Sequence, residues 1–274
     1  DPDFVAKAKA GRSQDINTCI ACNQACLDHA FRNELATCLV NPRAARETVL
    51  VIRPSPQRKR YAVVGAGPAG LAAATMLAER GHETHLYEAS AQVGGQFNMA
   101  KRIPGKEEFS ETLRYFARRI EATGVHLHLN TRVGAEDLVA RKFDAVILAT
   151  GVTARDPKIP GQASPHVLSY IDVLLHGKPV GERVAVVGAG GIGFDVAEFL
   201  VTRPGHSPTM NLAEWLQEWG VADPAEVRGG VVRARRRAAL RGRGHDLRRR
   251  RVARVSADAA AGRGMAGIGR AHRA

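Results

Sequence analysis

The residues most able to do chemistry in this chain are four cysteines in one short segment. Cys19, Cys22 and Cys26 occupy "CIACNQACLDHAF" and Cys38 follows in "TCLVNPRAA", which gives the spacing C-x2-C-x3-C-x11-C; the rest of the 274 residues contains no cysteine. A chain of this length can build its core without covalent cross-links, so disulfides explain the cysteines poorly. Clustered thiolates are instead typical ligands of iron–sulfur clusters and of zinc.

The spacing of the thiols favours an iron–sulfur cluster. Three thiolates from one loop and a fourth from just beyond it suit a cubane, in which each iron takes one sulfur. Structural zinc commonly uses two C-x2-C pairs, and only one such pair is present here. Zinc and unrelated thiols remain the alternatives.

The net charge of +13 comes from the last part of the sequence. Residues 228–274 hold 15 arginines and two acidic residues, with no lysine and no aromatic residue, whereas the charges of residues 1–227 cancel. A basic segment can bind phosphate through counterion release, but single-strand binders usually add aromatic side chains for stacking. The composition therefore argues against nucleic-acid binding. A non-catalytic basic protein that binds nucleic acid through this tail remains the alternative to an enzyme. We expect residues 228–274 to be a disordered, low-complexity tail. Its composition is the one expected if the gene is read in a shifted frame over this part.

Strands that alternate with helices predict an α/β fold with a doubly wound parallel sheet. An apolar run in "YAVVGAGPAG" stops at glycines, and the helix formers of "LAAATMLAERG" follow it. "THLYE", "VHLHL" and "DAVILATG" predict further strands, and "KEEFSETLRYFARRIEATG" predicts a helix. "RVAVVGAGGIGFDVAEFLV" then repeats the order of strand, glycine turn and helix. The sequence thus predicts tandem Rossmann-like folds that bind FAD and NAD(P).

The first glycine turn has the pattern G-x-G-x-x-G at Gly65, Gly67 and Gly70. The first glycine permits the tight turn, the second lets the backbone approach a pyrophosphate, and the third lets helix and strand pack closely. Glu88 ends the next predicted strand, 23 residues after Gly65, where a ribose hydroxyl needs an acceptor. Dinucleotide binding is the prediction, and a purely structural turn is the alternative.

The second glycine turn repeats the motif at Gly188, Gly190 and Gly193. A strand is predicted before it and a helix after it, as a nucleotide site requires. Its ribose partner is not identified, because no second strand is apparent before the basic tail.

The three expected redox groups differ in how many electrons they carry. A nicotinamide gives up two electrons as hydride, an iron–sulfur cluster carries one electron at a time, and a flavin can exchange electrons with both. We therefore expect FAD at the first turn, NADPH at the second, and the cysteines as the one-electron relay.

Several segments resemble the bacterial NADPH-dependent 2,4-dienoyl-CoA reductases, in the Old Yellow Enzyme and trimethylamine-dehydrogenase-like group of flavoproteins. They are "INTCIACNQACLDHAF", "CLVNPRA", "VVGAGPAGLAAA", "GGQFNMAKRIPGKEEFSETLRYF" and "VAVVGAGGIGFDVA". The resemblance implies an FMN-bearing barrel, then a 4Fe-4S segment, then an FAD domain with an NADPH domain inserted in it. It also implies electron transfer from NADPH through FAD, the cluster and FMN to an enoyl- or dienoyl-CoA in fatty acid β-oxidation. An enoate reductase and an amine dehydrogenase are the alternatives within the group.

The resemblance also assigns cofactor contacts by motif. It implies that the four cysteines, Cys19, Cys22, Cys26 and Cys38, hold the 4Fe-4S cluster, and that FAD contacts Ala69, Glu88, Gln96, Lys106 and Val133. No catalytic residue is assigned, because the FMN barrel with the substrate residues is expected to be missing. We therefore expect the chain alone to be inactive on dienoyl-CoA.

The expected organisation follows from these motifs. The segments are a remnant of the last barrel helix (1–14), the iron–sulfur segment (15–55), an incomplete FAD-binding domain (56–180), the start of an NAD(P)H-binding domain (181–227) and the basic tail (228–274). No apolar run approaches the roughly 18 residues that would span a bilayer. With no secretory leader at its start, the sequence predicts a cytoplasmic protein without a membrane partner.

Overall fold

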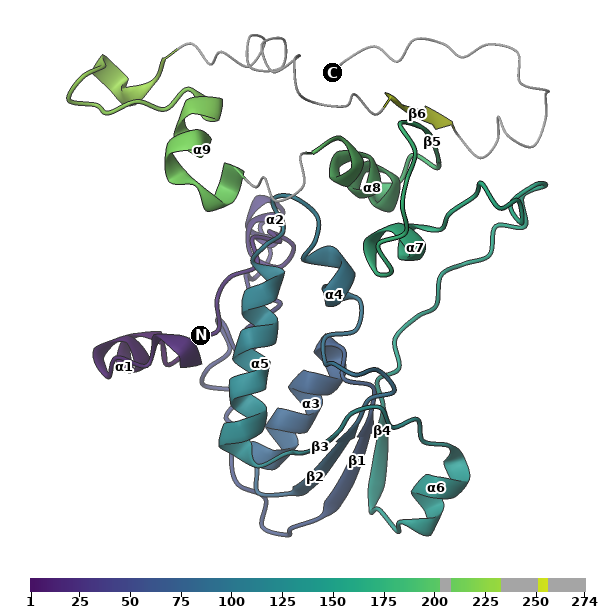
Figure 1. Cartoon of the computed structure of the whole chain (residues 1–274). Helices are drawn as coiled ribbons and strands as arrows, with labels where there is room; N and C mark the ends of the chain where they lie inside the picture. Colours follow the sequence, from purple (N-terminus) through teal and green to yellow (C-terminus); the bar gives the residue numbers. More distant parts are fainter. Residues whose placement is uncertain (203–207, 233–250, 256–274) are drawn as a thin grey trace. The chain divides into compact units, whose positions relative to one another are not determined.

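The computed structural model describes residues 1–202, 208–232 and 251–255. These residues belong to two compact units (Figure 1). Unit 1 comprises residues 1–101 and 106–154, and unit 2 comprises residues 102–105 and the described residues from 155 onward. Across the described ranges, no helix combines the length and the apolar character needed to cross a bilayer.

The core of unit 1 is a parallel sheet with the strand order β3-β2-β1-β4. Val63 at the centre pairs with Leu86 on one side and Ile147 on the other, and all three side chains are apolar. The prediction of an α/β fold with a parallel sheet is therefore confirmed. The strands are β1 Arg60–Val64, β2 Glu83–Tyr87, β3 His126–His128 and β4 Ala145–Leu148.

Two helices cover one face of this sheet (Figure 1). α3 (Pro68–Glu79) joins β1 to β2, and α5 (Phe109–Thr123) lies between β2 and β3 in the chain. Their apolar side chains close the core with the central strands, and α5 stops at Gly124, whose φ of 71° is left-handed. The buried core residues are Val63, Ala66, Leu71, Ala74, Leu86, Ile120 and Val125.

Short elements complete unit 1. α4 (Phe97–Ala100) precedes α5, and α6 (Ala135–Ala140) joins β3 to β4. Before the sheet come α1 (Phe4–Lys9), a 3-10 helix (Ser13–Asp15) and α2 (Leu27–Phe31). The cysteine segment therefore consists mainly of loop. Hydrogen bonds of its side chains and backbone, and not regular secondary structure, hold its conformation.

Unit 2 contains the second glycine turn. Its helices are α7 (Tyr170–Leu174), α8 (Gly191–Val201) and α9 (Leu212–Trp219), with 3-10 turns at Pro208–Met210 and Arg228–Gly230. β5 (Arg183–Val187) runs directly into the glycine turn before α8. β6 (Arg251–Val255) pairs with β5 in parallel, from Arg183↔Arg251 to Val187↔Val255.

β6 corrects one prediction about the basic tail. We expected residues 228–274 to be disordered, but 228–230 form a 3-10 turn and 251–255 form a strand. The backbone N–H and C=O groups along β5 need partners, and a short strand supplies them. β6 is also the second strand that the sequence did not reveal for this unit. Residues 233–250 and 256–274 lie outside the described residues.

Candidate functional site

The first glycine turn requires glycine at two of its three positions. Gly65 has a φ of 101°, and a Cβ there would meet the carbonyl oxygen of Ala149 on the neighbouring strand's continuation. A Cβ on Gly70 would collide with the carbonyl oxygen of Gly65. These two glycines therefore let β1, the turn and α3 approach one another closely.

The middle glycine, Gly67, differs from the other two because a side chain at its position would enter free space. A Cβ on Gly67 would meet no atom within 4 Å. Gly67 is also the N-cap of α3 and makes no side-chain capping hydrogen bond, while Pro68 occupies the first turn. The exposed Ala69 follows it. The amide groups at this helix end thus face a space that an anion can enter, and this fits the pyrophosphate of FAD.

Glu88 lies directly after β2 and is bound to the glycine turn. Its Oε2 accepts from the N–H of Ala66 at 2.8 Å, and its Oε1 accepts from the N–H of Ser90 at 2.8 Å. Partial burial would raise the pKa of Glu88, but these backbone hydrogen bonds outweigh it and lower the pKa below its usual range. The side chain is therefore an ionised acceptor beside the turn, as a ribose contact requires.

The loop before α4 lies against the same turn. The N–H of Gly94 donates to the carbonyl of Ala66 at 2.8 Å, and a Cβ on Gly95 would lie 3.1 Å from the Cα of Gly67. Gln96, the N-cap of α4, is exposed and donates from Nε2 to the carbonyl of Val152 at 3.0 Å. The structure thus brings Gln96 close to the first turn.

Two other predicted FAD contacts lie in loops of unit 1. Val133 is half-buried after β3, two residues beyond Thr131, whose N–H donates to the carbonyl of Glu88 at 2.8 Å. The loop of Val133 is therefore tied to the end of β2. Lys106 is half-buried in the loop between α4 and α5.

The second glycine turn repeats the geometry of the first within unit 2. Gly188 has a φ of 113°, and a Cβ on Gly193 would collide with its carbonyl oxygen. Gly190 is the N-cap of α8, has no side-chain capping hydrogen bond, and faces no atom within 4 Å of a Cβ position. The same arrangement of a free helix end and an open space fits a second dinucleotide.

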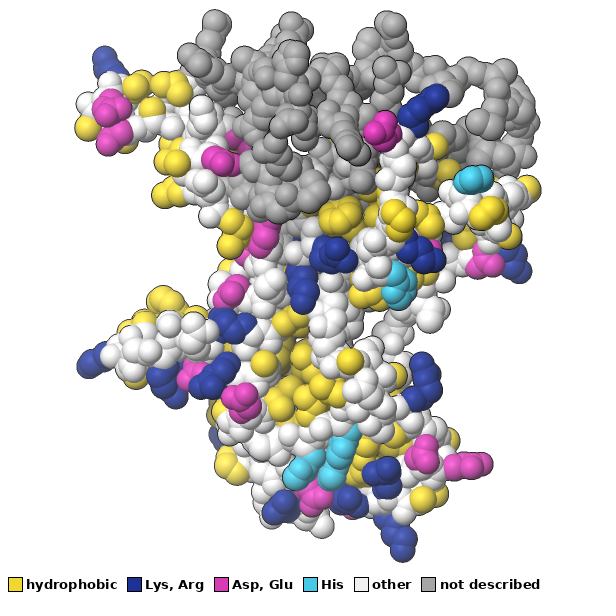
Figure 2. All heavy atoms as spheres, viewed as in Figure 1, with side chains coloured by type: hydrophobic (Ala, Val, Ile, Leu, Met, Phe, Trp, Pro, Cys, Tyr) yellow, Lys and Arg dark blue, Asp and Glu magenta, His cyan; other side chains and the backbone are white. Residues whose placement is uncertain are grey.

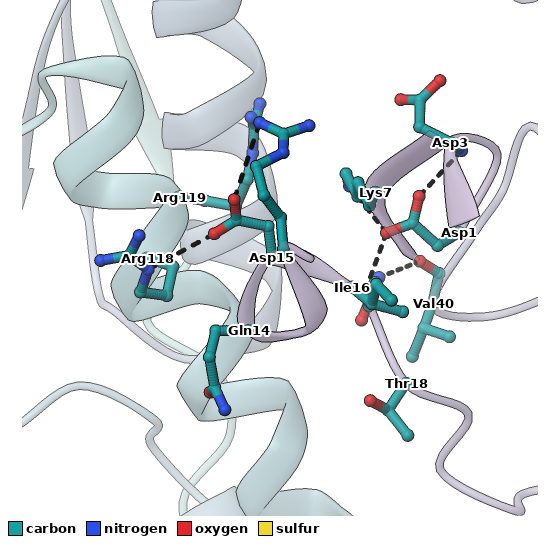
Figure 3. Close-up of polar contacts among 12 residues, drawn as sticks. Asp1, Asp3, Lys7, Gln14, Asp15, Ile16, Thr18, Val40, Arg118 and Arg119 are labelled. Atoms are coloured by element: carbon teal, nitrogen blue, oxygen red, sulfur yellow. Dashed lines mark hydrogen bonds and ion pairs between the residues drawn. The ribbon is translucent and has the colours of Figure 1, made fainter. Parts of the chain in front are cut away.

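The segment before the cysteines is anchored on α5. Arg114 donates from Nη2 to the carbonyl of Ile16 at 2.9 Å and to Oγ1 of Thr18 at 3.3 Å, and from Nη1 to the carbonyl of Gln14. Figure 3 shows Asp15 directed toward Arg118, whose Nε lies 3.4 Å from Oδ1. The backbone leading to Cys19 is therefore held by α5.

The four cysteines are free thiols near the surface. Cys19 and Cys26 are exposed, while Cys22 and Cys38 are half-buried. Sγ of Cys19 accepts from the N–H of Ala21 at 3.3 Å, and Asn17 donates to the carbonyl of Val40, so the two parts of the segment are joined. Thiols of this kind have the donor chemistry of an iron–sulfur ligand set.

The placement of the thiols, however, does not form a closed metal site. In the parts of the chain that the structure describes, no three Cys, His, Asp or Glu side chains are grouped to hold one ion. The assignment of Cys19, Cys22, Cys26 and Cys38 to a 4Fe-4S cluster therefore stays a prediction from their spacing. The lack of a three-residue group applies to zinc as well as to a cluster. Only the spacing of the cysteines in the sequence therefore favours one over the other.

Comparison with known proteins identifies the family. The family described as Pyridine nucleotide-disulphide oxidoreductase matches residues 59–227, more than half of the chain. The chain belongs to the pyridine nucleotide-disulphide oxidoreductase family. The match covers both glycine turns and supports FAD and NAD(P) as cofactors of a flavin-dependent oxidoreductase. Because residues 59–227 contain no cysteine, this family member has no disulfide within the matched residues.

Similar proteins include both reductases and an amine dehydrogenase. A metal reductase of Desulforamulus reducens is 36% identical over 73% of this chain and 30% of its own length. The solved structure of a 2-naphthoyl-CoA reductase complex has a TM-score of 0.73 and 29% identity, covering 93% of this chain and 37% of that one. Histamine dehydrogenase from Rhizobium sp. 4-9 has a TM-score of 0.64 and 28% identity, covering 73% of this chain and 32% of that one. The chain thus spans about a third of the proteins it resembles.

Sequence reasoning missed one group of side chains in unit 1. Three histidines lie together on β2 and β3: the ring of His126 stacks on that of His85 with centroids 4.7 Å apart, and Nδ1 of His85 lies within hydrogen-bond distance, 3.0 Å, of Nε2 of His128. The available signal was the alternation of "HLH" in one strand beside "THLYE" in another, since alternate residues of a strand share a face. Their pairing depends on strand register, which the sequence pattern did not provide.

Proposed function

We propose that this chain is the electron-input part of an NADPH-dependent flavin oxidoreductase resembling 2,4-dienoyl-CoA reductase. The first glycine turn binds FAD and the second binds NADPH. The observation that carries the proposal is the open space at Gly67, at an uncapped helix end beside the ionised Glu88. When bound, FAD supplies a group that accepts hydride from a nicotinamide and releases electrons singly.

The residues of this chain then have distinct tasks. Amide groups at the start of α3 neutralise the pyrophosphate, because the helix dipole and free N–H donors favour an anion there. Glu88 accepts from ribose hydroxyls with the lone pairs that its backbone partners leave available. Gln96 at the start of α4 and Lys106 in the loop after it contact FAD, with Lys106 offering its charge to the flavin or to the phosphates. At the second turn, the start of α8 binds the dinucleotide in the same way.

FAD titration tests this assignment with matched glycine variants. Gly67→Ala fills the open space, so we expect FAD binding, followed by quenching of flavin fluorescence, to weaken at least tenfold while the fold persists. Gly181→Ala is the control, because a Cβ there also meets no atom within 4 Å but Gly181 belongs to neither glycine turn. Equal FAD affinity of the two variants would contradict FAD binding at the first turn.

We further propose that Cys19, Cys22, Cys26 and Cys38 hold a 4Fe-4S cluster when iron and sulfide are supplied. Their spacing supports this, although the thiols must move to converge. Anaerobic reconstitution followed by iron and sulfide analysis tests the proposal. Cys22→Ser should abolish stable iron binding. Zinc retention in place of iron, or iron content unaffected by the substitution, would refute the cluster.

The acceptor of the whole protein is proposed as an unsaturated acyl-CoA, reached through FMN. The similarity to 2-naphthoyl-CoA reductase, which covers 93% of the chain, supports a CoA thioester. The similarity to histamine dehydrogenase supports an amine substrate as the second candidate. The direction of electron flow separates them: NADPH bleaches the flavin band of a reductase, whereas the amine itself bleaches that of an amine dehydrogenase.

A further inference from the structure

Two histidines lie on the face of the unit 1 sheet that is turned away from α3 and α5. Leu86 belongs to the core that these helices close, so its neighbour His85 points to the other face. Nδ1 of His85 lies 3.0 Å from Nε2 of His128, and the ring planes differ by 3° with centroids 5.3 Å apart. The rings therefore meet edge to edge in one N–H···N hydrogen bond, and His85 and His128 are here called the histidine pair. Figure 2 shows histidine side chains at the surface over this sheet.

An ionised carboxylate fixes the direction of this hydrogen bond. Nε2 of His85 lies 3.0 Å from Oε1 of Glu83. Hydrogen bonds from His85, then from Arg60, lower the pKa of Glu83 to about 2, so this carboxylate is ionised and only accepts. The proton of neutral His85 therefore lies on Nε2, and its Nδ1 accepts from the Nε2–H of His128.

The hydrogen bond of the pair survives one added proton but not two. A first proton can occupy Nδ1 of His128, and the Nε2–H of His128 then still donates to His85. A second proton must occupy Nδ1 of His85, which places two N–H groups against each other across the 3.0 Å that separates the nitrogens. Two positively charged donors repel each other and form no hydrogen bond.

The surroundings of the pair oppose the second proton. Burial, followed by the positive charges of His85, Arg141 and His126, lowers the pKa of His128 below its usual value of 6.5. Glu83 favours protonation, but Nε of Arg60 lies 2.8 Å from Oε1 of this carboxylate and offsets its charge. The charged and titratable groups on the neighbouring elements are Arg58 and Arg60 before and in β1, Glu83 and Tyr87 on β2, His126 on β3, Arg141 after α6 and Asp144 before β4.

His128 also belongs to the backbone that holds Glu88. β3 has three residues and stands at the end of the strand order β3-β2-β1-β4. The carbonyl of His128 accepts from the N–H of Glu88 at 2.9 Å, and the carbonyl of Glu88 accepts from the N–H of Thr131 at 2.8 Å. The carboxylate of Glu88 in turn accepts from the N–H of Ala66 in the first glycine turn. Because so short a strand has few backbone hydrogen bonds, its side-chain contacts matter for its order.

We propose that the histidine pair is a pH-sensitive contact between β2 and β3: a second proton breaks it, loosens the end of β3 and weakens the hold on Glu88 at the first glycine turn. A consequence for FAD rests on the proposed function of that turn, whereas the loosening of β3 does not. In the unfolded chain both histidines take up protons as the pH falls below 6.5, but the folded pair resists the second one, so stability decreases in that direction. The pKa of Glu88 lies below 4.5, so the range between these two pH values tests the histidines while Glu88 stays ionised.

Amide hydrogen exchange of the full chain, expressed as protection factors, tests the contact. As the pH falls from above 6.5 toward 4.5, the amides of Glu88 and Thr131 should lose protection about tenfold, while that of Val63 in the central strand β1 keeps it. His128→Gln retains an N–H donor for Nδ1 of His85 but takes up no proton, so its protection should not change with pH. His126→Gln is the matched control, because His126 stacks on His85 at 4.7 Å but is not part of the N–H···N bond, and it should respond as the wild type does.

Two further measurements separate the possible outcomes. Imidazole NMR of the wild type should show that the pair takes its second proton only below pH 6.5, and a single step for both rings at 6.5 would overturn the proposal. FAD affinity should fall about tenfold over the same range in the wild type and stay constant in His128→Gln. Absence of FAD binding at every pH would contradict the proposed function alone. Unchanged protection of Glu88 in the wild type, or an equal loss in His128→Gln, would overturn the pH-sensitive contact.

Discussion

Oε2 of Glu88 accepts a hydrogen bond from the backbone N–H of Ala66 at 2.8 Å, which joins the end of β2 to the glycine turn. The other carboxylate oxygen accepts from the N–H of Ser90 at 2.8 Å. One side chain therefore orders both the turn and the loop after β2. Since each carboxylate oxygen has two acceptor sites, this positioning task is compatible with ribose binding. Glu88 thus has a structural task even without the cofactor.

Replacing the carboxylate of Glu88 should lower stability in a pH-dependent way. Glu88→Gln should reduce the free energy of unfolding by about 1–2 kcal/mol at neutral pH, because charge-assisted bonds to Ala66 and Ser90 are weakened. The folded pKa lies below the usual 4.5, so the wild type has this stabilisation above pH 4.5 and loses it as the pH falls through the folded pKa. Urea unfolding at several pH values measures the difference.

The control for this prediction is an exposed glutamate of the same unit. Glu136→Gln, in the first turn of α6, should change the free energy of unfolding by no more than about 0.5 kcal/mol. If Glu88→Gln behaved like this control, or if its deficit persisted undiminished at acid pH, the carboxylate would not hold the turn.

The two glycine turns should respond alike to substitution at their third glycine. Gly70→Ala and Gly193→Ala each place a Cβ against the carbonyl oxygen of the first glycine in the turn, backbone that cannot move aside cheaply. We expect each substitution to lower the free energy of unfolding by about 2 kcal/mol or more. Chemical unfolding followed by circular dichroism measures the effect.

The middle glycine of each turn provides the internal comparison. A Cβ at Gly67 or Gly190 meets no atom within 4 Å, and both residues have extended backbone angles that alanine can adopt. Their alanine variants should lose no more than about 1 kcal/mol, the cost of a poorer N-cap. Similar losses at the middle and third positions would mean that close packing is not the reason for the third glycine.

Much of the nucleotide-binding architecture could be predicted because its signals are local. The change from apolar runs to helix formers at each glycine turn marked β1, α3, β5 and α8, all of which the structure contains. Gly65 and Gly70 could be assigned roles from their spacing, since strand–turn–helix geometry fixes which position needs no side chain. The open space at Gly67 follows from the same rule.

Features that depend on distant pairing could not be predicted. β6 pairs with β5 across more than 60 residues of chain, and its arginine-rich sequence lacks the apolar alternation of a strand. The grouping of His85, His126 and His128 depends on the register of β2 and β3, which the local sequence pattern leaves open. The backbone partners of Glu88 were also missed, because a motif assigns the carboxylate to a ligand and not to an amide of the turn.

The last prediction concerns how the cysteine segment is held on α5. Arg114 has a side chain only 23% exposed and donates to two backbone carbonyls and one hydroxyl of residues 14–18. Arg114→Met keeps the length of the side chain but removes these donors. We expect it to lower the free energy of unfolding by about 2 kcal/mol and to speed proteolysis within this segment.

Arg118 is the matched control on the same helix. Its side chain is 53% exposed and its ion pair with Asp15 is 3.4 Å long, so Arg118→Met should cost no more than about 0.5 kcal/mol. Limited proteolysis of both variants separates a local loss of structure from global unfolding. If residues 14–18 alone are loosened, the sheet of unit 1 stays protected from the protease. Because Cys19 follows Thr18 directly, faster cleavage there in Arg114→Met would show that α5 sets the position of the first thiol. Equal cleavage in the two variants would show that other contacts of the segment, and not Arg114, set the position of Cys19.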